Sequence, residues 1–204
     1  MVTVTCAPRY FVAVIEPGAT KSLKKGRIKV MIDISSNSLL RNRIRVVNGS
    51  REPVAVYPVD ITLNIKGSEV ILPAVLNYHE YVTMRYDEAR KRCSGTEFRY
   101  TCIEKIDKYF KRYLKVKQFP YGEIPPRKKI TGFFAFNLPD PFNSTDQSKR
   151  VADLLREKKK MTAATITVRV VAVDSGKDLF FNFPVNVITS DDEQNTLLRI
   201  MRNY

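Results

Sequence analysis

The side chains with the strongest potential for chemistry are one histidine and three cysteines. His79 is the single histidine, and Cys6, Cys93 and Cys102 are the cysteines. One histidine cannot form a His-rich metal site, and no two cysteines have the C-x-x-C spacing of zinc sites. A nucleophilic pair of His79 with Cys93 or Cys102 would require the two side chains to lie within hydrogen-bond distance in the folded chain, and the sequence does not show that proximity. The sequence therefore predicts no metal, no cofactor and no enzyme activity.

Phosphate-binding and nucleophile motifs are also missing from the sequence. The chain has 8 glycines and contains no G-x-x-x-x-G-K-[ST], G-x-G-x-x-G or G-x-S-x-G pattern. Neighbouring carboxylates occur at Asp191 and Asp192, at the start of a predicted helix, where the helix dipole favours negative charge. We expect no small-molecule substrate.

The cysteines instead raise a question of compartment. Cys93 and Cys102 lie close together in the chain and are a candidate disulfide, which would imply an oxidising compartment. The alternative is two ordinary thiols. Cys6 is a candidate for lipid attachment, although the preceding residues TVT fit that pattern poorly.

Positive charge is the other prominent feature. The chain carries 35 Lys and Arg against 21 Asp and Glu, for a net charge of +14. Residues 85–129 alone hold 14 Lys or Arg against 6 Asp or Glu, which fits an anionic partner such as nucleic acid or a membrane surface. The candidate anion- or partner-binding residues are Lys105, Lys108, Lys111, Arg112, Lys115, Lys117, Arg127, Lys128 and Lys129.

Part of this basic segment has helical periodicity. Ile103, Ile106, Phe110 and Tyr113 follow one another at steps of three and four, and most lysines fall on other faces. The pattern predicts an amphipathic helix with a basic face. One interpretation is a binding surface, and the other is a helix that covers the core with its apolar side while its cations are merely solvated.

The elements on either side of the basic segment are predicted to be strands. In RIKVMIDIS, Ile28, Val30, Ile32 and Ile34 alternate with more polar residues and should share a buried face. Asn48-Gly49 suits a tight turn between two adjacent strands. In GFFAF, Gly132 should let another segment pass close, with Phe134 and Phe136 on one buried face.

These patterns predict one mainly β domain over residues 1–204. A basic helical insertion is expected at about 85–120 and a helical connection at about 144–160. A short C-terminal helix should follow the capping box of Ser190 and Glu193. No apolar run is long enough to cross a bilayer.

Two motifs in this order of elements resemble the immunoglobulin-like domains of bacterial envelope proteins and lipoproteins. One is a strand-turn-strand pattern and the other a Pro-Pro step before an aromatic strand. The matching residues are Val47, Asn48, Ser50, Pro53, Val54, Val56, Pro58, Asp60 and Leu63 in the first motif, and Pro125, Pro126, Gly132, Phe133, Phe134 and Phe136 in the second.

The resemblance implies an immunoglobulin-like β-sandwich that acts without catalysis in adhesion, assembly or scaffolding of the cell envelope. Its partner would be a protein or another envelope component. It also implies an extracytoplasmic location, periplasmic or membrane-anchored, reached after removal of a leader. Since residues 1–18 do not read as a signal peptide, a cytoplasmic location is the alternative. The alternative function is polyanion binding, including nucleic acid, by residues 85–129.

Overall fold

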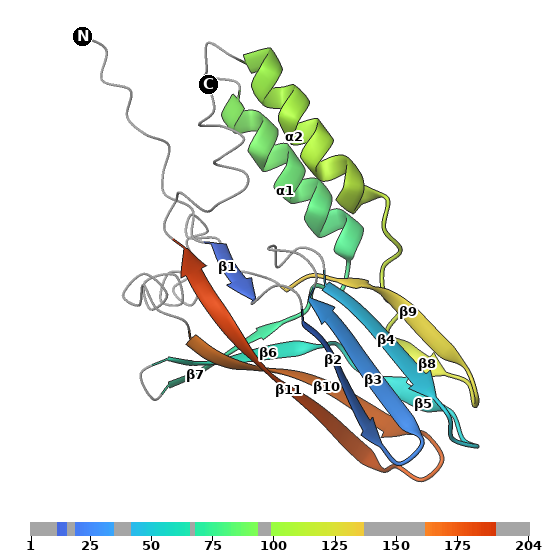
Figure 1. Cartoon of the computed structure of the whole chain (residues 1–204). Helices are drawn as coiled ribbons and strands as arrows, with labels where there is room; N and C mark the ends of the chain where they lie inside the picture. Colours follow the sequence, from blue (N-terminus) through green and yellow to red (C-terminus); the bar gives the residue numbers. More distant parts are fainter. Residues whose placement is uncertain are drawn as a thin grey trace.

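The structure is a computed structural model that describes residues 12–15, 19–34, 42–65, 68–93, 99–136 and 162–190. Within these ranges the chain is mainly β, with two sheets and two helices, as the sequence predicts. Figure 1 shows the helices projecting from one end of a body made of the two sheets. We call this part the two-sheet body.

The larger sheet is organised around the long hairpin of its last two strands. β11 pairs with β1 on one side and with β10 on the other, and β10 then pairs with both β5 and β6. β5 and β6 are separated at Pro58, which has no N–H to donate to a strand ladder. Its strands are β1 (Val12–Ile15), β5 (Val54–Val56), β6 (Asp60–Ile65), β7 (Ser68–Pro73), β8 (Gly122–Ile124), β10 (Thr162–Ala172) and β11 (Asp178–Ser190).

The smaller sheet has the order β2-β3-β4-β9, and every pairing between named strands is antiparallel. β2 was not expected, because its sequence ATKSLKK has a single large apolar residue, Leu23. An edge strand exposed on both faces gives no alternating pattern, and its lysines also discourage pairing with other chains. The strands are β2 (Ala19–Lys25), β3 (Ile28–Ile34), β4 (Asn42–Asn48) and β9 (Lys129–Phe134).

One hydrophobic core fills the space between the two sheets. The predicted inward residues of β3 are all buried, and Ile28, the most exposed of them, keeps only 4% of its surface. β10 alternates in the same way, with Ile166, Val168 and Val170 fully buried against the residues from the other sheet. This burial confirms the predicted faces and joins the sheets into one body.

Gly132 and its aromatic neighbours behave as predicted. The chain segment at Phe119 runs beside β9, where Phe119 N donates to Phe133 O at 2.8 Å. Phe134 and Phe136 are both buried, with ring centroids 5.2 Å apart. The GFFAF stretch is therefore core, except that Phe133 turns the other way and packs under the helices.

The helices are α1 (Tyr78–Cys93) and α2 (Arg99–Leu114), inserted between β7 and β8. We call them the helix pair. α2 covers the predicted helix, but α1 begins near residue 78, well before the expected start near residue 85. Its first turns contain Tyr81, Val82 and Thr83, which have low intrinsic helix propensity, so packing against α2 helps to make this segment helical.

The start of α1 also has a local signal in the sequence. Asn77 Oδ1 accepts the backbone N–H of Glu80 at 3.2 Å, and the Glu80 carboxylate accepts from Asn77 Nδ2 at 2.8 Å. The first bond makes Asn77 the N-cap of α1, and the second joins the two side chains. The N-x-x-E pattern in the sequence marks the helix start.

The expected tight turn at Asn48-Gly49 is wrong. Asn48 is the last residue of β4 and pairs with Ile28 in the smaller sheet, whereas β5 belongs to the larger sheet. The segment between them crosses from one sheet to the other, because the buried Asn48 side chain bonds to the crossing chain instead of turning it back. The helical connection at about 144–160 and the C-terminal helix after Ser190 lie outside the described residues, and β11 itself extends to Ser190.

Candidate functional site

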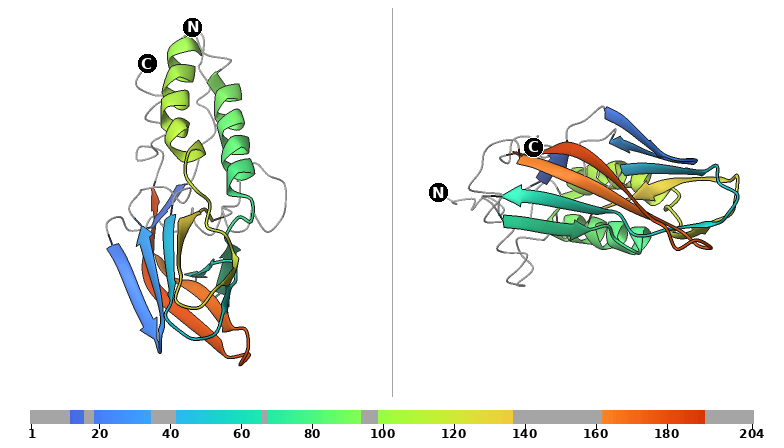
Figure 2. Two further views of the ribbon diagram at one scale, coloured as in Figure 1. Left: turned by 90° about the vertical axis from the view of Figure 1, so that its right-hand side faces the viewer. Right: turned by 90° about the horizontal axis from the view of Figure 1, so that it is seen from below.

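The helix pair has its own small core, separate from that of the two-sheet body. Phe110 and Ile106 of α2 are fully buried against Tyr78 and Val82 of α1. The same cluster contains Ala135, and Phe133 packs against it, so the base of the pair rests on the chain around β9. Figure 2 shows the pair standing away from the sheets beyond this base.

A disulfide between Cys93 and Cys102 links the helices at the end remote from the body (Figure 1). Their Cα atoms are 5.7 Å apart, and both residues are buried in the core of the helix pair. In this oxidised state neither sulfur is a free thiolate. His79 lies in the first turn of α1, and this 16-residue helix puts it roughly 20 Å from Cys93. The structure therefore does not bring together the Cys-His pair considered from the sequence.

A polar contact joins the helices midway along their length. Tyr86 donates its phenol hydrogen to Asp107 Oδ1 at 2.7 Å, and Arg90 Nε lies 3.7 Å from the same oxygen. The Arg90 guanidinium also lies over the Tyr86 ring, 5.4 Å from its centroid. The hydrogen bond to Asp107, with burial as a smaller cause, raises the pKa of Tyr86. These groups hold the helices together and leave Asp107 already partnered.

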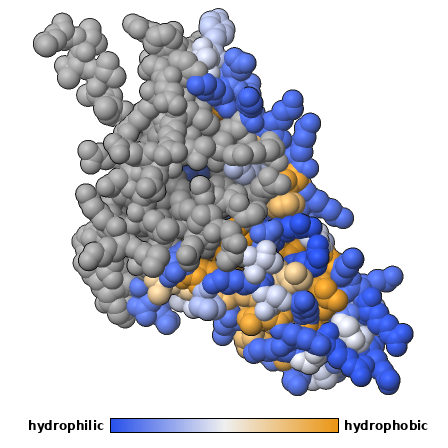
Figure 3. Space-filling view, in the orientation of Figure 1, coloured by the Kyte–Doolittle hydropathy of each residue, from blue (hydrophilic) through white to orange (hydrophobic). Residues whose placement is uncertain are grey.

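The first group of candidate cations lies on α2 and the chain that follows it. Lys108 and Lys111 are exposed on the helix, while Lys105 is half-buried and already has a partner. Arg112 belongs to α2, but its side chain is not described. No Asp or Glu occurs from residue 108 to residue 117, and Lys115 and Lys117 are exposed just beyond the helix. Figure 3 shows hydrophilic side chains along the α2 side of the pair.

The second group lies at the opposite end of the two-sheet body. Arg127 and Lys128 are exposed in the turn between β8 and β9, and Lys129 begins β9. Lys129 pairs with Val47 near the end of β4, whereas Phe133, farther along β9, reaches the helix pair. The length of β9 therefore separates Arg127, Lys128 and Lys129 from the α2 cations. A segment that is continuous in sequence forms two basic surfaces.

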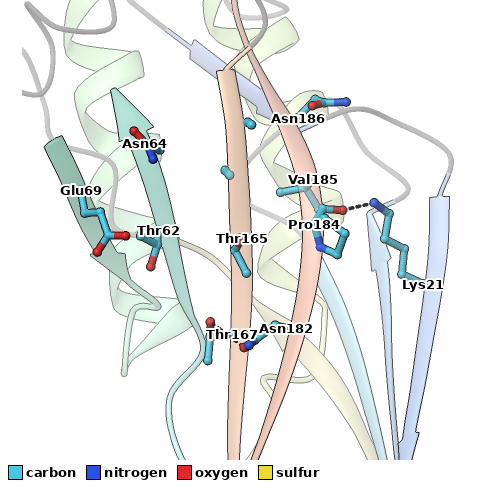
Figure 4. Close-up of a pocket in the computed structure, with 12 residues that line it drawn as sticks. Lys21, Thr62, Asn64, Glu69, Thr165, Thr167, Asn182, Pro184, Val185 and Asn186 are labelled. Atoms are coloured by element: carbon cyan, nitrogen blue, oxygen red, sulfur yellow. Dashed lines mark hydrogen bonds between the residues drawn. The ribbon is translucent and has the colours of Figure 1, made fainter. Parts of the chain in front are cut away.

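A third polar surface, which sequence reasoning missed, is the outer face of the larger sheet (Figure 4). A shallow hollow there is lined by Thr62, Thr165, Thr167, Asn182 and other outward residues of neighbouring strands. Thr167 Oγ1 lies 3.2 Å from Asn182 Oδ1. Glu69 is the single carboxylate in the lining. These groups can form hydrogen bonds, but they do not provide an acid paired with a base.

Within the described ranges, no three His, Cys, Asp or Glu side chains are grouped so that they could hold a metal ion. Neither α1 nor α2 combines the length and apolar character that a membrane span requires.

No protein-family model matches the chain, and no curated protein matches it.

Proposed function

We propose that this protein is a non-catalytic module of the cell envelope, an immunoglobulin-like β-sandwich that uses its helix pair to contact a protein partner or envelope component. The observation that carries the proposal is the Cys93–Cys102 disulfide, which ties together two helices standing away from the sheets. Disulfides persist mainly in oxidising compartments such as the bacterial periplasm. The proposal therefore includes an extracytoplasmic location.

The arrangement of strands supports the immunoglobulin-like part of the proposal. Two sheets of antiparallel strands share one core, and the chain crosses between them after Asn48. Crossing connections between facing antiparallel sheets are typical of such sandwiches. The residues of the resembling motif, from Val47 to Leu63, span this crossing.

The helix pair suits assembly better than catalysis. Its core is small, its end is closed by a disulfide, and Tyr100 near that end has 88% of its surface exposed. Tyrosine is among the residues enriched at the centres of protein interfaces. A rigid pair of helices with an exposed aromatic residue is a surface that a partner protein can recognise.

Cell fractionation combined with trapping of thiols tests this function. Source cells are separated into envelope, periplasmic and cytoplasmic fractions in the presence of an alkylating reagent, and the protein is analysed by mass spectrometry without reduction. We expect recovery outside the cytoplasm, with Cys93 and Cys102 joined and unalkylated. The mass of the mature N-terminus also shows whether Cys6 carries a lipid. Cytoplasmic protein with both cysteines alkylated would refute the proposal.

A second candidate function is polyanion binding by the α2 surface within residues 85–129. The run of cations from Lys108 to Lys117 without an acidic residue favours it. Because phosphate contacts release counterions, binding to duplex DNA should weaken steeply with salt. The logarithm of the binding constant should fall with the logarithm of the salt concentration, with a slope of roughly 0.9 for each phosphate contact. The double variant Lys108→Glu with Lys111→Glu should lower that slope.

The matched control is Lys24→Glu with Lys29→Glu, which makes the same charge change on the exposed face of the smaller sheet. If DNA is attracted only by the total charge of +14, the two double variants should lose binding equally, because they change that charge by the same amount. Binding that is insensitive to salt, or equal losses in the two variants, would rule out a specific α2 surface.

A further inference from the structure

A basic cavity lies at the end of the two-sheet body remote from the helix pair. Its walls come from the β2–β3 turn, the crossing segment after β4 and the β10–β11 hairpin. Figures 1 and 2 both show the two turns at this end. The cavity has a volume of about 600 Å³ and is shallow and broadly open to solvent, like the hollow on the outer face of the larger sheet.

The lining of the cavity is strongly asymmetric in charge. The lining contains four cations, Lys25, Arg27, Arg51 and Lys177, and one carboxylate, that of Glu52. Glu52 is already engaged, since its two oxygens accept hydrogen bonds from the Ser175 backbone N–H at 3.0 Å and from the Ser175 hydroxyl at 3.1 Å. None of the four cations forms an ion pair within the described part of the chain. Lys25 Nζ lies over the Phe181 ring, 6.0 Å from its centroid, so the charge of Arg27, Arg51 and Lys177 is the part most available to a ligand.

The walls are held together by a buried asparagine. Asn48 Nδ2 donates to the carbonyl oxygens of Glu52 at 2.9 Å and of Ile124 at 3.1 Å. Asn48 Oδ1 accepts from the Ser50 backbone N–H at 3.0 Å and from its hydroxyl at 2.6 Å. These bonds fix the crossing segment that carries Arg51. They also join it to the strand end before Arg127.

The other two walls are tied to the same segment. Gly49 N donates to Arg27 O at 2.9 Å, and a Cβ atom at residue 49 would lie 2.7 Å from that oxygen. Val173 N donates to Pro53 O at 3.0 Å, next to the Ser175–Glu52 bonds. The cations therefore lie on loops that are hydrogen-bonded to one another. A ligand would need to order little of the backbone, so the entropy cost of binding is small.

We propose that this cavity binds a small ligand carrying two or more phosphate groups. The two guanidinium groups can each bind phosphate oxygens with paired hydrogen bonds, while the two ammonium groups add charge. Arg127, Lys128 and Lys129 extend the positive surface beside the cavity, since Asn48 N donates to Lys128 O at 2.9 Å. The source of the phosphates is either a soluble oligophosphate or the head group of a phosphorylated lipid. The proposal does not depend on the helix pair.

Calorimetric titration of the full chain with inorganic tripolyphosphate at constant ionic strength tests the site. The double variant Arg51→Ser with Lys177→Ser should bind at least about tenfold more weakly, because hydrogen bonds to charged groups are the stronger kind. The control, Lys108→Ser with Lys111→Ser, removes the same charge at the other end of the molecule and should bind within about twofold of the parent chain. Equal losses in both variants would overturn the proposal.

A measurement on the unmodified chain guards against variants that fail to fold. In amide-resolved NMR, tripolyphosphate should shift the signals of Gly26, Gly49 and Gly176, which lie on the three walls. Shifts confined to α2, or no shifts at millimolar ligand, would contradict the proposal.

A vesicle assay separates the two phosphate sources. Sedimentation with vesicles containing phosphatidylinositol 4,5-bisphosphate, compared with vesicles of neutral lipid alone, should show binding that Arg51→Ser with Lys177→Ser abolishes if the ligand is a lipid head group. Tripolyphosphate binding without vesicle binding would support a soluble oligophosphate. If the parent chain binds neither tripolyphosphate nor the vesicles, the cavity is not a phosphate site. The envelope proposal is tested separately, by fractionation.

Discussion

The backbone of Phe119 lies directly against Gly132, so that a Cβ atom on Gly132 would stand 2.3 Å from the Phe119 Cα. Both residues are buried, and the obstructing atoms belong to the backbone, which cannot rotate away. Gly132→Ala should therefore lower the free energy of unfolding by roughly 1–3 kcal/mol, as expected for overpacking a core. Urea unfolding of the two proteins measures the difference.

The control for Gly132→Ala is Ser22→Ala on the exposed edge strand β2, which should change stability by less than about 0.5 kcal/mol. Equal stability of Gly132→Ala and the parent chain would mean that the segment at Phe119 does not pass where the structure puts it.

Reduction of Cys93–Cys102 should destabilise the helix pair. The bond closes a short loop, with a sequence separation of 9, and such loops contribute about 2–3 kcal/mol by restricting the unfolded chain. Urea unfolding with and without a reductant measures the loss, and Cys93→Ala with Cys102→Ala should reproduce it. If reduction leaves the unfolding curve unchanged, the bond does not form in the folded protein.

The buried side chain of Asn48 should be essential for the loops around the basic cavity. Asn48→Ala leaves the carbonyl oxygen of Ile124 without that donor in a buried setting, at a cost of about 1–3 kcal/mol. Asn64→Ala, on the exposed face of β6, is the matched control and should be nearly neutral. Thermal unfolding compares the two. Similar midpoints for both variants would contradict the role of Asn48.

Asp60 and its burial predict an unusual pH dependence. Burial raises the pKa of Asp60, so the folded state disfavours its charged form. Its favourable contribution to stability is fully present below its ordinary pKa of 3.8 and is lost as the pH rises through the higher folded value. Asp60→Asn should therefore unfold at higher urea concentration than the parent chain at pH 7 and lose this advantage near pH 3. A variant less stable than the parent at pH 7 would argue against burial as the dominant effect.

Asp178 should titrate in the opposite direction. Its carboxylate binds Arg169 through two hydrogen bonds, Nε to Oδ1 at 2.8 Å and a terminal guanidinium nitrogen to Oδ2 at 3.0 Å, and this lowers the pKa of Asp178. The stabilising effect is present above pH 3.8 and is lost as the pH falls through the lower folded value. NMR titration of the carboxyl carbon should give a midpoint below 3.8 that returns toward this value in Arg169→Gln. An unchanged midpoint in that variant would show that the ion pair does not form in solution.

Local patterns in the sequence were sufficient for much of the β architecture. The alternation in β3 and β10 predicts which residues are buried, because successive side chains of a strand point to opposite faces. The steps of three and four residues in α2 predict its apolar face for a similar reason, and the glycine in GFFAF predicts a close approach at Gly132. Where the local pattern was weak, as in the polar edge strand β2 and the aromatic start of α1, the elements were missed.

The sequence by itself determined the mainly β character, the buried faces, the α2 helix and the total positive charge, because these depend on residue type and short-range periodicity. Only the tertiary structure decided how the charge is distributed. The crossing after Asn48 and the length of β9 separate the α2 lysines from Arg127, Lys128 and Lys129. The same packing brings Arg27, Arg51 and Lys177 together from three distant segments. Such contacts depend on long-range strand pairing, which no local spacing in the chain encodes.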